Sequence, residues 1–158
     1  MKICTSINCT MVPDKIITTF LDKQTALTIA TTVDDNPYCA TCFYAYSGGS
    51  GILVFKSSRD TIHIQNGIKN SRISGCVLPD KLIIGKVQGV QFSGVFVEPE
   101  GKMLEEAKRS YYKKYPFALA IPGELWAVKL SHIKFTDSTL GFGKKLIWDN
   151  QEEVKAVS

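Results

Sequence analysis

Histidine is scarce in this 158-residue chain, and several catalytic motifs and long apolar runs are missing. The two histidines come without a Gly-x-Ser-x-Gly elbow, and neither a Gly-x-Gly-x-x-Gly turn nor a P-loop occurs, so a hydrolase triad or a Rossmann-type site has no support. No stretch approaches the ~18 consecutive apolar residues that a spanning helix needs. The N-terminus has no charged segment followed by an apolar one, and we therefore expect a cytoplasmic protein without an export signal.

The composition is that of an ordinary globular protein. Hydrophobic residues make up 44% of the chain and aromatic residues 10%, which excludes a disordered protein. The length predicts one domain over residues 1–158, with an ordered core at about 12–148 and a polar tail at 149–158. The net charge of +4 suits a small anionic ligand better than a nucleic acid. Five cysteines, an odd number, are expected to be free thiols.

The apolar periodicity alternates between helix and strand types. Helical spacing occurs at residues 12–23, 61–70 and 101–115, and strand-type patterns occur at 26–33, 38–46, 52–56, 73–78, 82–98, 126–135 and 146–148. Residues 82–98 contain two apolar runs and are expected to form long, bent strands with bulges at some of their glycines. A phase shift at Ser131-His132 predicts a bulge in the strand that contains it. We expect an α+β fold of mainly antiparallel type, a small barrel of about seven strands with three helices.

The Cys39-Ala-Thr-Cys42 stretch is the most obvious candidate for metal or redox chemistry. Zinc sites and thioredoxin-like sites both use C-x-x-C. Here the stretch falls within a predicted strand, where positions 39 and 42 point to opposite faces. Neither a second C-x-x-C nor paired histidines follow, so the sequence predicts two unlinked cysteines and no metal.

The stretch from Ile52 to His63 is the most informative for ligand binding. A strand ends in Lys56-Ser57-Ser58-Arg59 and a helix follows at once, with Ser58 as its expected N-cap and Asp60 in its first turn. Two cations, three hydroxyls, a histidine and the free N–H groups of a helix start are therefore close in sequence. This set suits a phosphate. The alternative is a capped helix after a solvated basic turn.

The order of strands, turns and helices resembles the FMN-binding split barrels related to pyridoxamine 5'-phosphate oxidase. Three stretches look like the uncharacterised bacterial YhbP family: Thr61-Ile62-His63, Gly89 to Gly94, and the C-terminal region with Ile133–Asp137 and Leu140–Trp148. The resemblance runs from about residue 14 to 148. It implies a split β-barrel homodimer with two FMN sites at the dimer interface, and an FMN-dependent oxidoreductase of unknown small-molecule substrate.

The resemblance also implies which side chains bind the cofactor. The positions that match the phosphate side are Lys56, Ser57, Ser58, Thr61 and His63. The positions that match the strand along the flavin ring are Thr41, Cys42, Phe43 and Tyr44, with Gln91 as a polar strand residue near the ring. Trp126 and the block Phe142–Lys145 would come from the other subunit. The oxidase has an Arg-Lys pair where this chain has Ile62-His63, and its Arg-x-His substrate motif is missing, so pyridoxamine 5'-phosphate oxidation is not expected.

Two other functions stay open. One is a non-enzymatic binding module for flavin or another phosphorylated or tetrapyrrole ligand, which the small number of titratable groups favours. The other is a nucleic-acid-binding barrel, suggested by the basic and aromatic stretch Lys108 to Lys114. Those residues share a helix with an apolar face, so a solvated helix is the simpler explanation. We expect neither nucleic acid nor a membrane among the partners.

Overall fold

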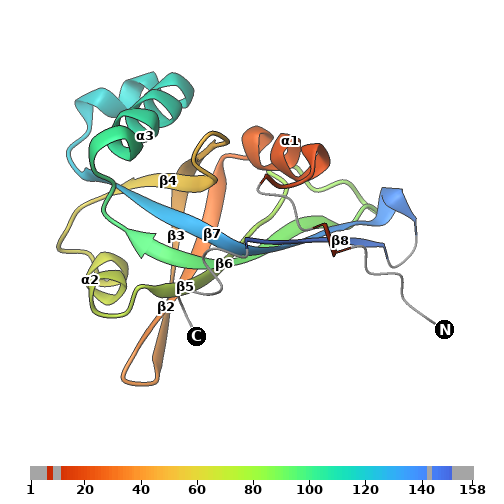
Figure 1. Ribbon diagram of the computed structural model, residues 1–158, viewed down its shortest axis with the longest axis horizontal. Coiled ribbons are helices and arrows are strands. Elements are labelled where there is room, and N and C mark those ends of the chain that lie inside the picture. Colours follow the sequence, from red (N-terminus) through yellow and green to blue (C-terminus); the bar gives the residue numbers. More distant parts are fainter. Residues whose placement is uncertain (1–6, 9–11, 142–143, 151–158) are drawn as a thin grey trace.

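Eight strands form one sheet in the computed structural model, which describes residues 7–8, 12–141 and 144–150. The strand order is β1-β8-β7-β4-β3-β2-β5-β6, and an additional pairing of β6 with β7 closes the six strands β2 to β7 into a barrel (Figure 1). The strands are β1 (Ile7–Asn8), β2 (Ala26–Val33), β3 (Asn36–Ser47), β4 (Ile52–Ser57), β5 (Arg72–Val77), β6 (Gln88–Val97), β7 (Glu124–Asp137) and β8 (Lys145–Asp149). All pairings within the barrel are antiparallel, which confirms the expected fold class.

The barrel interior is filled by alternate side chains of its strands. Leu27 and Ile29 of β2 and Tyr44 and Tyr46 of β3 belong to one buried cluster, at the period of two that a strand imposes. Phe55 of β4 joins the same cluster and is completely buried. The alternation predicted from the sequence therefore sets which face of each strand points inward.

Three α-helices, α1 (Lys15–Lys23), α2 (Ile62–Lys69) and α3 (Gly101–Lys114), pack around the barrel, with the 3₁₀ turns η1 (Pro116–Ala120) and η2 (Ser138–Leu140). The N-cap of α1 is Asp14, whose carboxylate accepts the Ile16 N–H at 2.8 Å. Helix α3 packs on the outside of β3 and β4, where Ala107 and Tyr111 meet Ala45 and Val54. Helices α1 and α2 lie at separate ends of the barrel (Figure 1).

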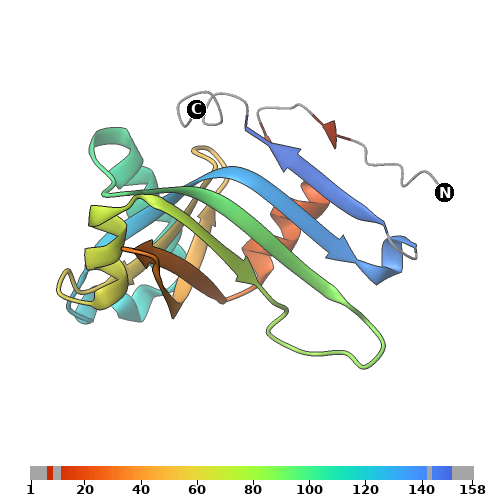
Figure 2. The ribbon, with the colours of Figure 1, turned by 90° about the horizontal axis from the view of Figure 1, so that it is seen from below.

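Two expectations about element boundaries were wrong. Helix α2 begins at Ile62, three residues later than a Ser58 cap would give, and its N-cap is Thr61. No acidic residue, and so not Asp60, lies in its first turn. The apolar run 82–98 is strand only from Gln88 onward. Residues 78–87 form a loop that projects from the barrel (Figure 2), because this segment has no neighbouring strand and turns at Gly85, whose φ is +81°.

The bulge expected at Ser131-His132 is confirmed. In the pairing of β6 with β7, Ser93 faces His132 but the next residue, Gly94, faces Leu130, so Ser131 is the extra residue. Its hydroxyl donates to the Ser93 carbonyl at 3.1 Å. Position 94 requires glycine where β6 lies against the bulge, since an added Cβ would lie 2.3 Å from the Lys129 carbonyl oxygen. In the described part of the chain, no helix is long and apolar enough to cross a membrane.

Candidate functional site

Strands β3 and β4 separate at the point where the predicted phosphate-side residues meet. Their pairing runs from Ser47↔Ile52 to Tyr44↔Phe55. Beyond that pair, β3 is hydrogen-bonded only to β2, and β4 continues to Ser57 beside β7. Four residues separate the end of β4 from the start of α2, and α2 packs on β2, β3 and β6. We call this point of divergence the split; Cys42 of β3 lies on one side of it, Ser57 of β4 lies on the other, and the buried His63 contacts both.

Four polar side chains come together at the split. His63 Nε2 lies 2.9 Å from Ser57 Oγ, 3.4 Å from Thr61 Oγ1 and 3.9 Å from Cys42 Sγ. Ser57 Oγ also lies 3.2 Å from Thr61 Oγ1. The structure therefore brings together three of the five residues matched to the phosphate side, and Cys42 of the ring-side strand.

The directions of these hydrogen bonds define the protonation of His63. The Thr61 hydroxyl donates to the Ser58 carbonyl at 2.8 Å, so Ser57 must donate in its contact with Thr61. The Ser57 hydroxyl proton is then donated to Thr61, so in the contact between Ser57 and His63 the donor must be the Nε2–H group of His63. Burial lowers the pKa of His63, so the imidazole is neutral near pH 7 with its proton on Nε2.

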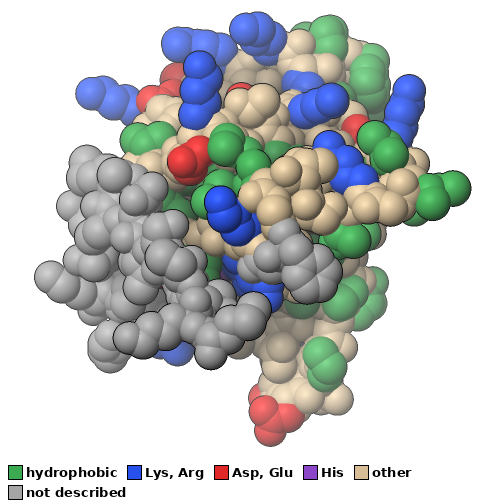
Figure 3. Space-filling view, turned by 90° about the vertical axis from the view of Figure 1, so that its right-hand side faces the viewer, with side chains coloured by type: hydrophobic (Ala, Val, Ile, Leu, Met, Phe, Trp, Pro, Cys, Tyr) green, Lys and Arg blue, Asp and Glu red, His purple; other side chains and the backbone are tan. Residues whose placement is uncertain are grey.

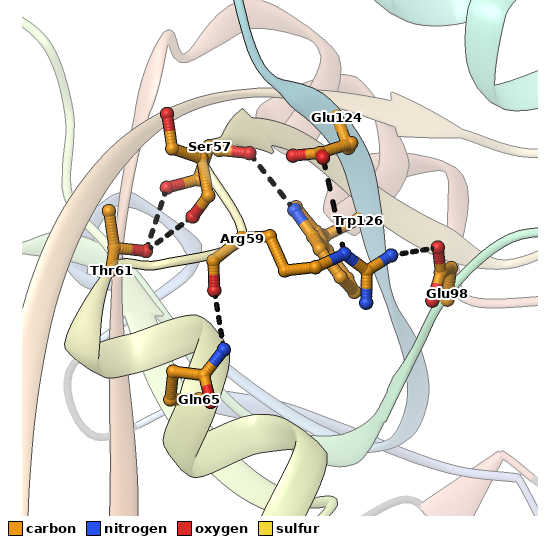
Figure 4. Close-up of polar contacts among 8 residues, drawn as sticks. Ser57, Arg59, Thr61, Gln65, Glu98, Glu124 and Trp126 are labelled. Atoms are coloured by element: carbon orange, nitrogen blue, oxygen red, sulfur yellow. Dashed lines mark hydrogen bonds and ion pairs between the residues drawn. The ribbon is translucent and has the colours of Figure 1, made fainter.

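Arg59 and Trp126 lie beside Ser57 (Figure 4). The Trp126 indole N–H donates to the Ser57 carbonyl at 3.1 Å, and the ring is completely buried within its own chain. The Arg59 guanidinium lies 4.8 Å from the centroid of that ring and pairs with Glu98 and, at 4.0 Å, with Glu124. Trp126 is thus covered by its own chain, which contrasts with the partner-facing position that the resemblance implies.

Lys56 and Ser58 lie away from this cluster. The Lys56 ammonium donates to the carbonyl oxygens of Ala118 at 2.7 Å and Ile121 at 2.6 Å, at the end of η1. Lys56 and Ser57 are consecutive strand residues, so their side chains point to opposite faces of β4. This alternation was a signal in the sequence that could have separated them. Ser58 is exposed and contributes its carbonyl to Thr61.

The ring-side strand presents different residues on its two faces. Cys42 and Tyr44 point inward, and Tyr44 is fully buried with its hydroxyl donating to the Leu21 carbonyl at 2.6 Å. Burial raises the pKa of the Cys42 thiol to about 11, so the thiol stays protonated. Thr41 and Phe43 point outward, and Phe43 is 59% exposed beside the Tyr115 ring. Cys39 is exposed on the outward face, so the two cysteines are separated as predicted.

The outer face beside Thr41 contains a shallow groove of about 380 Å³. Thr41 Oγ1 lies 3.3 Å from Thr28 Oγ1 on β2, and Cys76 of β5 lines the same groove. Gln91 of β6 is paired with Cys76 and is exposed on this face. Thr41 and Gln91 therefore share one face of the barrel, although they are 50 positions apart in sequence. Among the described residues, no group of three or more His, Cys, Asp or Glu side chains could hold a metal.

Two sets of long-range contacts, one at the split and one between β7 and β8, were not predicted from the sequence. The carboxylates that hold Arg59 come from residues 98 and 124, and only the barrel closure brings them together. His132 Nδ1 lies 2.6 Å from Asp149 Oδ1, because β7 and β8 pair in that register. Of the predicted block Phe142–Lys145, Phe142 lies outside the described residues, and Lys145 begins β8.

Comparisons with known proteins place the chain among uncharacterised bacterial proteins. No family model matches it. It is 32% identical over 134 residues to the UPF0306 protein plu4501 of Photorhabdus laumondii. The aligned region covers 85% of this chain and 94% of that protein. It is 33% identical over 129 residues to the UPF0306 protein YhbP of Salmonella schwarzengrund, which covers 82% of this chain and 88% of the relative.

Solved structures with this fold include proteins named for flavin and heme binding. A heme-binding protein from Mycobacterium smegmatis has a TM-score of 0.73 at 19% identity, over 87% of this chain and 58% of that protein. An FAD-binding protein from the same organism has a TM-score of 0.65 at 16% identity, over 81% of this chain and 97% of that protein. A Listeria innocua protein named after pyridoxamine 5'-phosphate oxidase has a TM-score of 0.58 at 13% identity, over 76% of this chain and 94% of that protein. These likenesses confirm the predicted split-barrel fold.

Proposed function

The chain belongs to the UPF0306 family, and from this premise we propose that it binds FMN at the split between β3 and β4 and uses the flavin as an oxidoreductase cofactor for a small molecule. The observation that carries the proposal is the convergence of Ser57, Thr61 and His63 at the start of α2. The flavin would supply the redox chemistry, and the protein supplies binding, orientation and charge.

The phosphate would be bound by hydroxyls, an imidazole and backbone N–H groups. The first intrahelical bond of α2 runs from Gln65 N–H to the Thr61 carbonyl, so the N–H groups before Gln65 have no carbonyl within the helix. Such groups at a helix start bind anions. Of the cations in the predicted set, Lys56 is turned away and Arg59 is paired with carboxylates. His63 is therefore the group that can add positive charge to a bound phosphate.

The ring would lie along the outward side of β3. A flavin ring needs a flat apolar face and hydrogen-bond donors for its carbonyl oxygens. Phe43 offers exposed aromatic surface, and the hydroxyl of Thr41 is accessible at the groove. The residues present thus fit both ends of the cofactor.

A second copy of the chain would cover the ring. In Figure 2 the outer face of β5 and β6 carries no helix. The outward side chains there are small or polar, among them Ser74, Cys76, Gln91 and Ser93. We propose that two copies pair across this face, as the resemblance implies. Sedimentation velocity would give a dimer mass, and Thr28→Arg, which places a charge in the groove, would shift the protein to monomer.

Titration with FMN and with riboflavin tests the proposal. FMN is expected to quench protein fluorescence and to bind at least tenfold more tightly than riboflavin, because riboflavin lacks the phosphate. Ser57→Ala should remove most of that difference, whereas Ser138→Ala, on the exposed turn η2, should leave it unchanged. If FMN leaves both flavin and protein fluorescence unchanged, the proposal is wrong.

A second candidate is a non-enzymatic binding module for flavin or another phosphorylated or tetrapyrrole ligand. The specific observation in its favour is that the split contains one imidazole, held neutral, and a thiol with a raised pKa, so it is poor in groups that transfer protons. The fold neighbour named for heme binding points to the tetrapyrrole variant. A bound flavin that neither NADH nor NADPH reduces would support this candidate, and turnover of an electron acceptor would exclude it.

A further inference from the structure

The loop of residues 78–87 exposes more aliphatic surface than any function proposed above uses. Leu82 is 86% exposed and Ile84 is fully exposed. Leu78, Ile83 and Val87 are also exposed, each by more than half. The loop projects away from the barrel as a protrusion (Figure 2). Contiguous apolar surface of this kind marks a site of interaction with a protein or a membrane.

Four lysines lie within this loop or beside a groove that it lines. Lys81 and Lys86 belong to the loop itself, and Lys86 lines a groove of about 460 Å³ whose opposite wall carries Lys15 and Lys23 of α1. The floor of the groove is apolar, with Phe20 and Phe135. Figure 3 shows this end of the molecule, where hydrophobic side chains stand among lysine and arginine side chains.

The carboxylates at this end are occupied by hydrogen bonds from the chain. Asp80 accepts the Thr25 N–H at 3.0 Å, and Asp14 caps α1. Asp137 lies buried in the groove near Lys86, where it accepts hydrogen bonds from Gln88 and Thr139. Burial raises the pKa of Asp137, but these hydrogen bonds and the charge of Lys86 outweigh that effect and lower it. None of the four lysines forms an ion pair with another described residue.

We propose that this end of the barrel docks on an anionic lipid surface. The aliphatic tip at Leu82 to Ile84 enters the boundary between headgroups and acyl chains, and the four lysines bind the lipid phosphates. Peripheral binding of this kind needs both buried apolar area and attraction to anionic lipids. It requires no spanning helix, and it departs from the expectation that no membrane is a partner. The loop shares only its first residues, Leu78 to Asp80, with the groove proposed for the flavin ring, and its tip does not line that groove.

The shape and charge favour a bilayer over a second copy of the chain. A protruding tip needs a complementary apolar pocket on a protein partner. The groove of about 460 Å³ has an apolar floor but a rim of lysines, and a second copy would bring like charges together there. A bilayer accepts a protrusion without a preformed pocket, and its phosphates complement the lysines.

Sedimentation with vesicles tests the proposal. The full chain is mixed with vesicles of phosphatidylcholine alone or with 30% phosphatidylglycerol, and the bound fraction is measured. We expect binding to the anionic vesicles that weakens with salt. The double variant Leu82→Ser with Ile84→Ser should lower the partition coefficient at least tenfold. Lys81→Gln with Lys86→Gln should lower it about 25-fold, at about fivefold per lysine. The matched controls, Ile68→Ser on α2 and Lys108→Gln with Lys113→Gln on α3, should bind as the natural chain does.

Two results would overturn the proposal. The first is that the natural chain binds neither kind of vesicle; if the Leu82→Ser, Ile84→Ser variant then also loses dimer mass in sedimentation velocity, the loop is assigned to a second copy. The second is that the loop variants and the control variants bind equally. Circular dichroism that matches the natural chain shows that each variant is folded.

Discussion

The pH dependence of FMN binding tests whether His63 is the cation of the phosphate site. Burial lowers the pKa of His63, so the free protein carries a neutral imidazole near pH 7. Its Nε2 lies 2.9 Å from Ser57 Oγ, beside the place proposed for the phosphate, and Cys42 and Thr61 are its other polar neighbours. A phosphate dianion bound there raises the pKa of the imidazole, so binding takes up a proton.

One proton taken up gives the size of the effect. Above a pH of about 6.5 the free imidazole is neutral, and the phosphate, with a second pKa of about 6, is a dianion. As the pH rises above about 6.5, the Kd for FMN should rise by up to about tenfold per pH unit, which is about 1.4 kcal/mol of binding free energy per unit. Fluorescence titration from pH 6.5 to 8 measures the slope. Riboflavin, which has no phosphate, should show none.

The substitution His63→Gln separates this effect from a structural one. Glutamine keeps a donor for Ser57 but does not titrate, so the variant should bind FMN more weakly and with a flat pH profile. A natural chain with a flat profile, or a variant with the same slope as the natural chain, would refute the assignment. The stability of the free protein should change in the opposite direction. Because the folded pKa lies below the unfolded one, stability falls as the pH drops below about 6.5. The His63→Gln variant should lose less stability than the natural chain over the same fall in pH.

Three further predictions follow from individual contacts. Glu98→Gln should raise the affinity for FMN severalfold, because it releases Arg59. The free energy of unfolding, measured by thermal denaturation, should fall by less than about 1 kcal/mol, because the pair is half exposed. Weaker FMN binding by this variant would mean that Glu98 instead holds Arg59 in the position that binding needs. Gly75→Ala should cost about 3 kcal/mol in urea unfolding, because its Cβ would lie 2.3 Å from a backbone oxygen, whereas Gly48→Ala, with its nearest contact at 3.5 Å, should be nearly neutral. Alkylation of Cys42 at pH 8, followed by mass spectrometry, should be about 100-fold slower than that of a thiol with the ordinary pKa of 9.0, because burial raises its pKa to about 11. Rapid alkylation in the folded protein would contradict that burial.

Local sequence patterns predicted several features of the fold correctly. The helical spacing at residues 12–23, the strand alternation that separates Cys39 from Cys42, and the phase shift at Ser131 all have the predicted structural outcome. Each depends on residues within a few positions of one another, where backbone geometry dictates the result. The strand prediction for residues 82–87 was wrong for the complementary reason, whereas residues 88–97 are strand. The apolar residues of segment 82–87 suit a strand, but whether they pair depends on where the neighbouring strands end.

The sequence by itself determined the antiparallel α+β class, the membership of the UPF0306 family and the short motif that contains Ser57, Thr61 and His63. Tertiary structure decided how that motif can act. The divergence of β3 and β4 placed Cys42 beside His63, the opposite faces of β4 turned Lys56 away, and closure of the barrel brought Glu98 and Glu124 to Arg59. These are contacts between residues far apart in the chain. They depend on strand register and on which side chains are excluded from water, and neither property is encoded within a short stretch.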